Sequence, residues 1–260
     1  LSNQIWSCLQ IFPYHSRYAV YKSWKGRGLG KEGIAGKHVE CCLCEQKALI
    51  GARGKLKRLT KDNKRLTGKY LAHHATSNPL VVYNLVLNQV RAYDNLIAIV
   101  VDALAVSTKL SRDVMTYCVV TFLEKDSKDG VRVSDDDATV APAFLTLSRF
   151  IGYYHRKFPT VELKGLLHYL SKRAEAGASD DLLVLKDLLT LMGGCDSIVE
   201  VSQSQLKGLS GGHTLRNEVM GGAAKELQSK TAMEMLRKEL LSSYVAVPII
   251  LNVAKIRKQL

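Results

Sequence analysis

Apolar residues recur at helical spacing in the stretch SNPLVVYNLVLNQVRAYDNLIAIVVDAL, residues 77–104. Asn78 is a good helix cap, and Pro79 suits the first turn, where its missing N–H has no intrahelical partner. Residues 91–95 offer turn and cap chemistry, and a second apolar stripe runs from Leu96 to Leu104. We therefore predict two helices that fold back on each other as an antiparallel hairpin.

Both of these segments carry apolar residues on more than one face, which predicts neighbours on either side, as for the inner helices of a stack. The β-branched runs VVYNLVLNQV and LIAIVV would also suit buried strands, but little else in the chain resembles a sheet. We therefore predict an all-α fold of stacked antiparallel helix pairs, a HEAT-like α-solenoid, although no residue-level repeat has a fixed period.

The same periodicity predicts the other helices. Tyr18, Tyr21 and Trp24 form an aromatic stripe in the first of them, and Gly177 and the pair 193–194 end two later ones. We expect N-caps at Ser111, Thr160 and Ser179, a polar loop over 124–137, and Asp136 and Asp137 in the first turn of the helix that ends before Phe158. The predicted helices lie near residues 14–25, 111–123, 137–157, 160–176, 179–192, 230–242 and 244–258.

A chain of 260 residues with 47% apolar residues is long enough to build a sizeable core. It starts at Leu1 without an initiator Met, which indicates a piece of something longer. We divide it into four parts. They are an N-terminal helix and Gly-rich link (1–36), a helical-repeat core (37–196), a polar Gly-rich region (197–228) and C-terminal helices that lead on to missing chain (229–260).

The formal net charge of +13 indicates an acidic partner, nucleic acid or an anionic membrane. Over half of the excess lies in RGKLKRLTKDNKRLTGK, where Asp62 is the single acid. Leu56, Leu59 and Leu66 are predicted to form the buried side of this segment, which is interrupted by Gly51 and Gly54. The cations would then face solvent or a phosphate backbone, although aromatic residues for stacking bases are lacking. We name this set the basic cluster: Arg53, Lys55, Lys57, Arg58, Lys61, Lys64, Arg65 and Lys69.

Candidate chemistry is sparse. The glycines of residues 26–33 lack the Gly-x-x-x-x-Gly-Lys-Ser/Thr order of a phosphate loop, so we interpret them as a flexible link. Cys41 and Cys44 form a CxxC pair without a second pair at zinc-ligand spacing, and the adjacent His73 and His74 would point in different directions on one helix. No catalytic motif is present. We predict no catalytic, metal or cofactor site, no membrane span, no small-molecule substrate, and a reducing compartment.

A series of segments in this chain resembles the family of the second subunit of the THO complex. The strongest is VYNLVLNQVRAYDNLIAIVVDAL, and the others occur in the same order. Coverage runs from Tyr14 to Lys258, while the segment 26–36 departs from the family's pattern. The matching segments include RLTKDNKRLTGKYLAH, LSRDVMTYC, the DDD-led helix ending in YHRKFP, ELKGLLHYL, AGASDDLLVLKDLLTLMGG, QLKGLSGGHTLRNE and AVPIILNVAKIR.

This resemblance implies an α-solenoid similar to the middle domain of translation initiation factor four-G. It also implies a non-catalytic scaffold in the nuclear THO/TREX assembly, which acts in transcription-coupled mRNA processing and mRNA export. The implied partners are other THO subunits, a DEAD-box mRNA-export ATPase and mRNA. The alternative from the residues themselves is a nucleic-acid-binding helical module that acts through the basic cluster.

Overall fold

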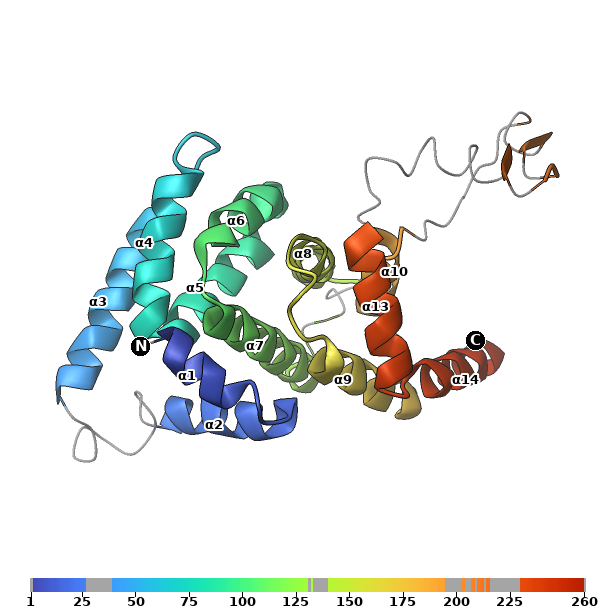
Figure 1. Ribbon diagram of the computed structural model, residues 1–260, viewed down its shortest axis with the longest axis horizontal. Helices are drawn as coiled ribbons and strands as arrows, with labels where there is room; N and C mark the ends of the chain where they lie inside the picture. Colours follow the sequence, from blue (N-terminus) through green and yellow to red (C-terminus); the bar gives the residue numbers. More distant parts are fainter. Residues whose placement is uncertain are drawn as a thin grey trace.

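Helices form every regular element in the part of the chain that the computed structural model describes, and there the all-α prediction is confirmed (Figure 1). The described residues are 2–26, 39–130, 132, 140–194, 203, 207–208, 210–212, 214–215 and 230–259. The α-helices are α1 (Ser2–Leu9), α2 (Tyr14–Gly26), α3 (Val39–Leu56), α4 (Lys64–Ser77), α5 (Pro79–Ala92), α6 (Ile97–Ala103), α7 (Lys109–Lys128), α8 (Pro142–Lys157), α9 (Lys164–Glu175), α10 (Leu182–Leu191), α13 (Lys230–Ser242) and α14 (Ala246–Gln259).

Helix α5 lies in the middle of the N-terminal half and contacts α3, α4, α7 and α8 (Figure 1). It begins at Pro79 with Asn78 at the N-cap position, as predicted, but the Asn78 side chain makes no capping hydrogen bond. Its buried side chains include Val82, Val86 and Val90, which lie one helical turn apart and are fully shielded from solvent. The prediction of a helix covered on more than one side is therefore confirmed for α5.

The predicted hairpin of α5 and α6 is only partly correct. Two 3-10 turns, Asp94–Leu96 and Leu104–Val106, flank α6, which packs mainly against α4 and α8 rather than α5. Gly68 on α4 explains this preference. A Cβ at Gly68 would lie 2.2 Å from the carbonyl oxygen of Ala103, so the absence of a side chain allows the two segments to approach closely.

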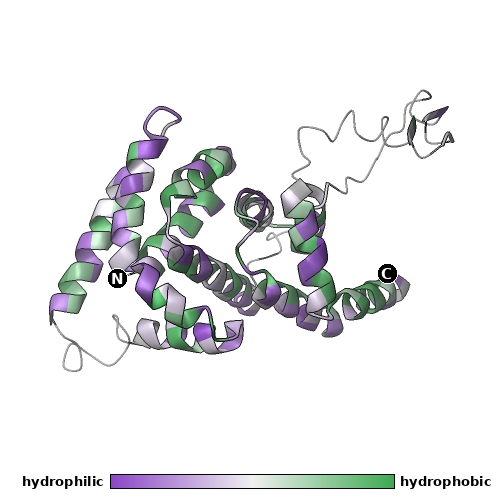
Figure 2. Cartoon of the chain, in the orientation of Figure 1, coloured by the Kyte–Doolittle hydropathy of each residue, from purple (hydrophilic) through white to green (hydrophobic). Residues whose placement is uncertain are grey.

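The predicted interruption of the basic segment at Gly51 and Gly54 is wrong. Helix α3 runs through both glycines, and a Cβ at Gly51 would lie 2.2 Å from the hydroxyl of Tyr70 on α4. The break falls instead at residues 57–63, where the Asn63 side chain accepts from Thr60 N at 2.9 Å and donates to Arg58 O at 2.7 Å. This hydrophilic turn stands at one end of the α3–α4 pair (Figure 2).

The leucines of this segment do not all share one side. Leu56 and Leu59 are buried as predicted, but Leu66 is 73% exposed. Its position explains the difference, because the buried face of α4 is formed by residues 67, 68, 71 and 75 and Leu66 lies opposite to it.

The three predicted caps are wrong. Helix α7 is capped by Thr108, whose hydroxyl accepts from Ser111 N at 3.2 Å, so Ser111 lies in the first turn. The N-caps of α9 and α10 are Leu163 and Asp181. Thr160 and Ser179 each precede a turn of irregular backbone before the helix begins.

The helix ends agree better with the sequence. Gly177 and Gly194 have φ values of +80° and +65° after α9 and α10, as glycines that end helices often do. Helix α8 ends at Lys157, before Phe158. Helix α7, however, continues to Lys128 through the start of the predicted polar loop.

Several predictions fall on residues outside the described part of the chain. They include the Gly-rich link after Gly26, the acidic residues 135–137, Cys195 and most of the polar region 197–228.

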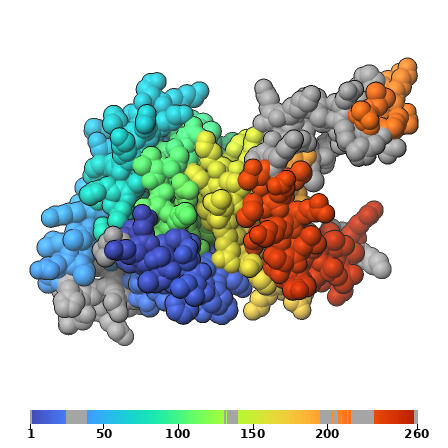
Figure 3. Space-filling model, viewed as in Figure 1, coloured from blue at the N-terminus to red at the C-terminus, as the bar shows by residue number. Residues whose placement is uncertain are grey.

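The terminal helices pack on the middle of the chain. Helix α1 contacts α7, and α2 contacts both α7 and α9. Figure 3 shows these dark blue helices lying directly against the middle of the chain. At the other end, α13 contacts α8 and α9, and α14 packs on α9. Residues far apart in sequence therefore meet near α7 and α9.

Candidate partner and nucleic-acid interface

The basic cluster lies on the α3–α4 pair and the turn between the two helices. Arg53 and Lys55 lie on α3, Lys57 to Lys61 in the turn, and Lys64 to Lys69 on α4. Lys64 is half-buried, and the side chains of the other seven are exposed. The structure thus keeps the predicted set together along the chain but gives its members four different surroundings.

Lys64 is part of an ion-pair network and is not a free surface cation. Its Nζ lies 2.6 Å from Oδ2 of Asp102 on α6, and Lys157 on α8 lies 3.1 Å from the other carboxylate oxygen. The hydrogen bond from Lys64, helped by Lys157, lowers the pKa of Asp102 although partial burial raises it. Asp102 therefore links α4, α6 and α8 through these two lysines, and a charge reversal at Lys64 would face its carboxylate.

Lys55 lies beside an aromatic ring, which the sequence analysis did not anticipate. Its Nζ is 5.4 Å from the centre of the Tyr70 ring, and the same ring packs at 4.5 Å from the His74 ring. This geometry is a cation–π contact between α3 and α4. The local sequence holds no sign of it, because it depends on how the two helices pair.

Arg53 and Lys57 line a groove of about 420 Å³ between α3 and α5. Its apolar lining residues are Leu49, Val81 and Leu85. The α5 side adds three side-chain amides that the sequence analysis missed, from Asn84, Asn88 and Gln89. Asn84 and Asn88 are four residues apart in a mostly apolar helix. This spacing is the one signal in the sequence that could have indicated a polar face shared by the two side chains.

Four exposed cations of the cluster lie outside this groove on α4 or the turn, namely Arg58, Lys61, Arg65 and Lys69. Arg65 and Lys69 are four residues apart on one face of α4, beside the exposed Leu66. Among the described residues, neither these four nor Arg53 and Lys57 have a carboxylate within 4.0 Å. All six are therefore available to a partner.

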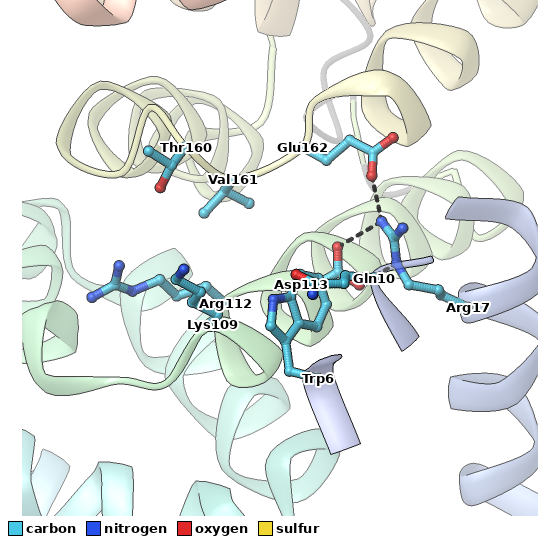
Figure 4. Close-up of a pocket in the computed structure, with 9 residues that line it drawn as sticks. All are labelled: Trp6, Gln10, Arg17, Lys109, Arg112, Asp113, Thr160, Val161 and Glu162. Carbon is cyan, nitrogen blue, oxygen red and sulfur yellow. Dashed lines mark hydrogen bonds and ion pairs between the residues drawn. The ribbon is translucent and has the colours of Figure 1, made fainter. Parts of the chain in front are cut away.

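A second pocket, of about 250 Å³, lies where α1, α2, α7 and the α8–α9 connection meet (Figure 4). Arg17 dominates it and is 3% exposed. Its Nε and Nη2 donate to the two carboxylate oxygens of Asp113 at 2.9 and 3.1 Å, and Nη2 also donates to Glu162. Burial lowers the pKa of Arg17, but the hydrogen bonds to Asp113 and Glu162 outweigh this and raise it.

The charges in this pocket largely neutralise one another. Tyr21 donates to Oδ2 of Asp113 at 2.6 Å, and its pKa is raised by burial and by the charge of that carboxylate. Arg112 is likewise engaged, because its guanidinium lies 4.4 Å from the centre of the Phe158 ring and donates to Ala105 O. The arrangement joins four elements and offers no nucleophile paired with a base.

Two further observations concern other site classes. The described residues contain no group of three or more His, Cys, Asp or Glu side chains placed to hold a metal ion, and Cys41 and Cys44 are exposed on α3. Within the same residues no single helix is long and apolar enough to cross a membrane. Helices α13 and α14 pass that test by length and composition only as a pair, which is bent by 86°.

Known proteins resemble this chain over almost its whole length. The family model for Thoc2, a transcription- and export-related complex subunit, matches residues 71–148. THO complex subunit 2 of Homo sapiens is 34% identical over 260 residues, which is 99% of this chain and 16% of that protein. The Arabidopsis thaliana protein of the same name is 29% identical over 99% of the chain, and the Saccharomyces cerevisiae protein is 23% identical over 83%.

The chain spans about a sixth of the human relative's length and a similar share of the plant and yeast proteins. The Thoc2 match covers α5, α6 and α7, which include the stretch that carried the resemblance in the sequence. The chain is therefore a homologue of THO complex subunit 2, matched along one part of that longer protein.

Proposed function

We propose that this chain is a non-catalytic scaffold segment of the nuclear THO/TREX complex. In this role it acts in transcription-coupled mRNA processing and mRNA export, and it holds other THO subunits together with a DEAD-box RNA helicase. The observation that carries the proposal is the similarity to THO complex subunit 2 along 99% of the chain. The helical stack with exposed cations supports it, because helical stacks of this kind offer extended binding surfaces.

We further propose that the helices form a HEAT-like α-solenoid of stacked antiparallel pairs, within the divisions 1–36, 37–196, 197–228 and 229–260. From α3 to α10, the main contacts of each helix are with helices one to three places along the chain. Contacts between near neighbours are the pattern expected of a solenoid. The first and last divisions would then cap or extend the repeat core.

Calorimetry of the 260-residue chain with the export DEAD-box ATPase tests the docking role. We expect saturable binding, and its absence would remove helicase docking from this segment. The matched variant carries Arg58→Glu, Lys61→Glu, Arg65→Glu and Lys69→Glu. It leaves Lys64 unchanged, because reversal there would break the ion pair with Asp102 and perturb the fold. If the folded variant still binds the ATPase, these four cations are not part of the helicase-docking surface and serve another ligand.

Nucleic-acid binding through the basic cluster is the second candidate function, and the exposed cations without ion-pair partners favour it. Affinity for a single-stranded RNA should then fall steeply with salt, with a log–log slope of about −0.7 for each phosphate contacted. The same four-residue variant should flatten that slope. If the slope of the variant is unchanged, the substituted cations do not contact the RNA.

A further inference from the structure

Asn84 and Asn88 on α5 form a wall shared by two grooves. One is the groove between α3 and α5 that Arg53 and Lys57 line, and the other, of about 210 Å³, lies between α5 and α7. The second groove has Leu80 and Phe122 among its lining residues and Lys125 as its cation. The two asparagines therefore stand on a ridge with an apolar, positively charged groove on each side.

The charge of this surface is unbalanced. Neither groove has a carboxylate among its described lining residues. Arg53, Lys57 and Lys125 have no carboxylate within 4.0 Å in the described part of the chain. The side chain of Asn88 is exposed and that of Asn84 is half-buried. A ligand that binds here gains both charge neutralisation and hydrogen bonds to amides.

The spacing of the asparagines suits an extended polypeptide. Residues four apart on a helix are separated by about 6 Å along its axis. An extended chain repeats every two residues, over about 6.6 Å. Each asparagine amide has donors and an acceptor, so it can bond both the N–H and the C=O of a peptide group. The pair can therefore bind alternate residues of one segment running along α5, and successive side chains of that segment would enter the two grooves.

We propose that the ridge and grooves along α5 bind an extended, acidic peptide segment of a partner protein, with its carboxylates near Arg53, Lys57 and Lys125. RNA fits this surface less well, because binding of single-stranded bases relies on open aromatic faces. Phe122 packs against the core, and the guanidinium of Arg91 lies 5.8 Å from the centre of its ring. This surface does not include the outer cations that are changed in the helicase experiment. The peptide proposal and the helicase proposal can therefore be contradicted independently.

Fluorescence anisotropy with the 260-residue chain tests the proposal. The probe is a labelled ten-residue peptide in which pairs of Leu alternate with pairs of Asp, so that both faces of the extended chain carry carboxylates. The comparison peptide has Lys in place of Asp. We expect the chain to bind the acidic peptide and the Lys peptide to bind at least about tenfold more weakly. Asn84→Ala with Asn88→Ala should weaken binding of the acidic peptide by about tenfold or more.

Two charge variants complete the test. Arg53→Glu with Lys57→Glu should weaken binding of the acidic peptide by about tenfold or more, while the matched control Lys61→Glu with Arg65→Glu should leave it within about twofold. Circular dichroism checks that each variant keeps its helices. The proposal is overturned by no binding of the acidic peptide, by equal loss in both charge variants, or by asparagine variants that bind normally. It is also overturned if a ten-nucleotide oligouridine binds more tightly through the same asparagines.

Discussion

Arg17 on α2 and Asp113 on α7 form an ion pair with 2.9 Å between Nε and Oδ2, and each side chain is 3% exposed. They are 96 residues apart in the sequence. Glu162, on the connection between α8 and α9, is the second carboxylate on the same guanidinium. This cluster therefore fixes α2 and the α8–α9 connection to α7.

Asp113→Asn removes the negative charge at nearly constant shape and leaves a buried guanidinium with one carboxylate. Losing one partner of a buried ion pair costs about 3–5 kcal/mol, and we expect the lower end because Glu162 remains. Urea unfolding measures this loss. The control is Asp94→Asn, because the pair of Asp94 with Arg149 is more than half exposed and should contribute within about 0.5 kcal/mol. Equal effects in both variants would contradict the role given to the buried pair.

Much of the helical framework could be predicted from the local sequence pattern, because buried residues of an amphipathic helix recur at intervals of three or four residues. Leu147 and Ile151 on α8 and Leu166 and Leu170 on α9 are buried as their spacing predicts. The Arg17 and Asp113 pair could not be predicted in this way. Nothing near either residue in the sequence indicates its partner, since the pairing depends on how α2 packs on α7.

The candidate site likewise combines features that the sequence predicts with features that depend on tertiary packing. The cations of the basic cluster are evident from composition, but their surroundings are set by tertiary packing. Lys64 reaches Asp102 because α4 packs on α6, and Arg53 shares a groove with Asn84 because α3 packs on α5. The predicted single basic face is therefore divided among an ion-pair network, a cation–π contact, a groove and an outer surface.

Gly68→Ala tests the close approach of α4 to the end of α6. The added Cβ would meet the Ala103 carbonyl oxygen at 2.2 Å, so one backbone segment must move. We expect a loss of about 2 kcal/mol or more in the free energy of unfolding, as for other overpacked sites. Chemical denaturation provides the measurement.

Gly54→Ala is the matched control for that substitution. Gly54 lies within α3, and beyond its chain neighbours and the adjacent backbone of the helix no described atom lies within 4 Å of its ideal Cβ position. Alanine there should stabilise the chain by about 0.5 kcal/mol through its higher helix propensity. A destabilising Gly54→Ala would contradict the continuous helix through this residue.

Thr108→Ala and Thr160→Ala compare the observed cap of α7 with the predicted cap of α9, which the structure does not show. Loss of the hydroxyl that accepts from Ser111 N should cost about 1 kcal/mol of unfolding free energy. Thr160→Ala should cost little, because Thr160 is exposed and does not cap α9. Thermal unfolding of both variants compares them, and a larger effect at Thr160 would restore the cap expected from the pattern.

His155 on α8 should make the stability of the chain depend on pH. It is fully buried, and no described residue hydrogen-bonds to either ring nitrogen. Burial lowers the pKa of His155 to about 3, whereas an unfolded histidine titrates near about 6.5. Between these values the unfolded state binds the proton and the folded state does not, so the free energy of unfolding falls as the pH falls.

His155→Leu removes this term and should reduce the loss of stability between pH 7 and pH 5. For the unsubstituted chain, the His155 contribution to that loss is about 2 kcal/mol, from about 1.4 kcal/mol for each pH unit below 6.5. Urea unfolding at the two pH values gives the difference directly, and contributions from buried carboxylates such as Asp126 cancel when the two chains are compared. His73→Gln, on the exposed face of α4, should keep the loss seen in the unsubstituted chain. If His155→Leu keeps it as well, the ring is protonated in the folded state and its burial is incomplete in solution.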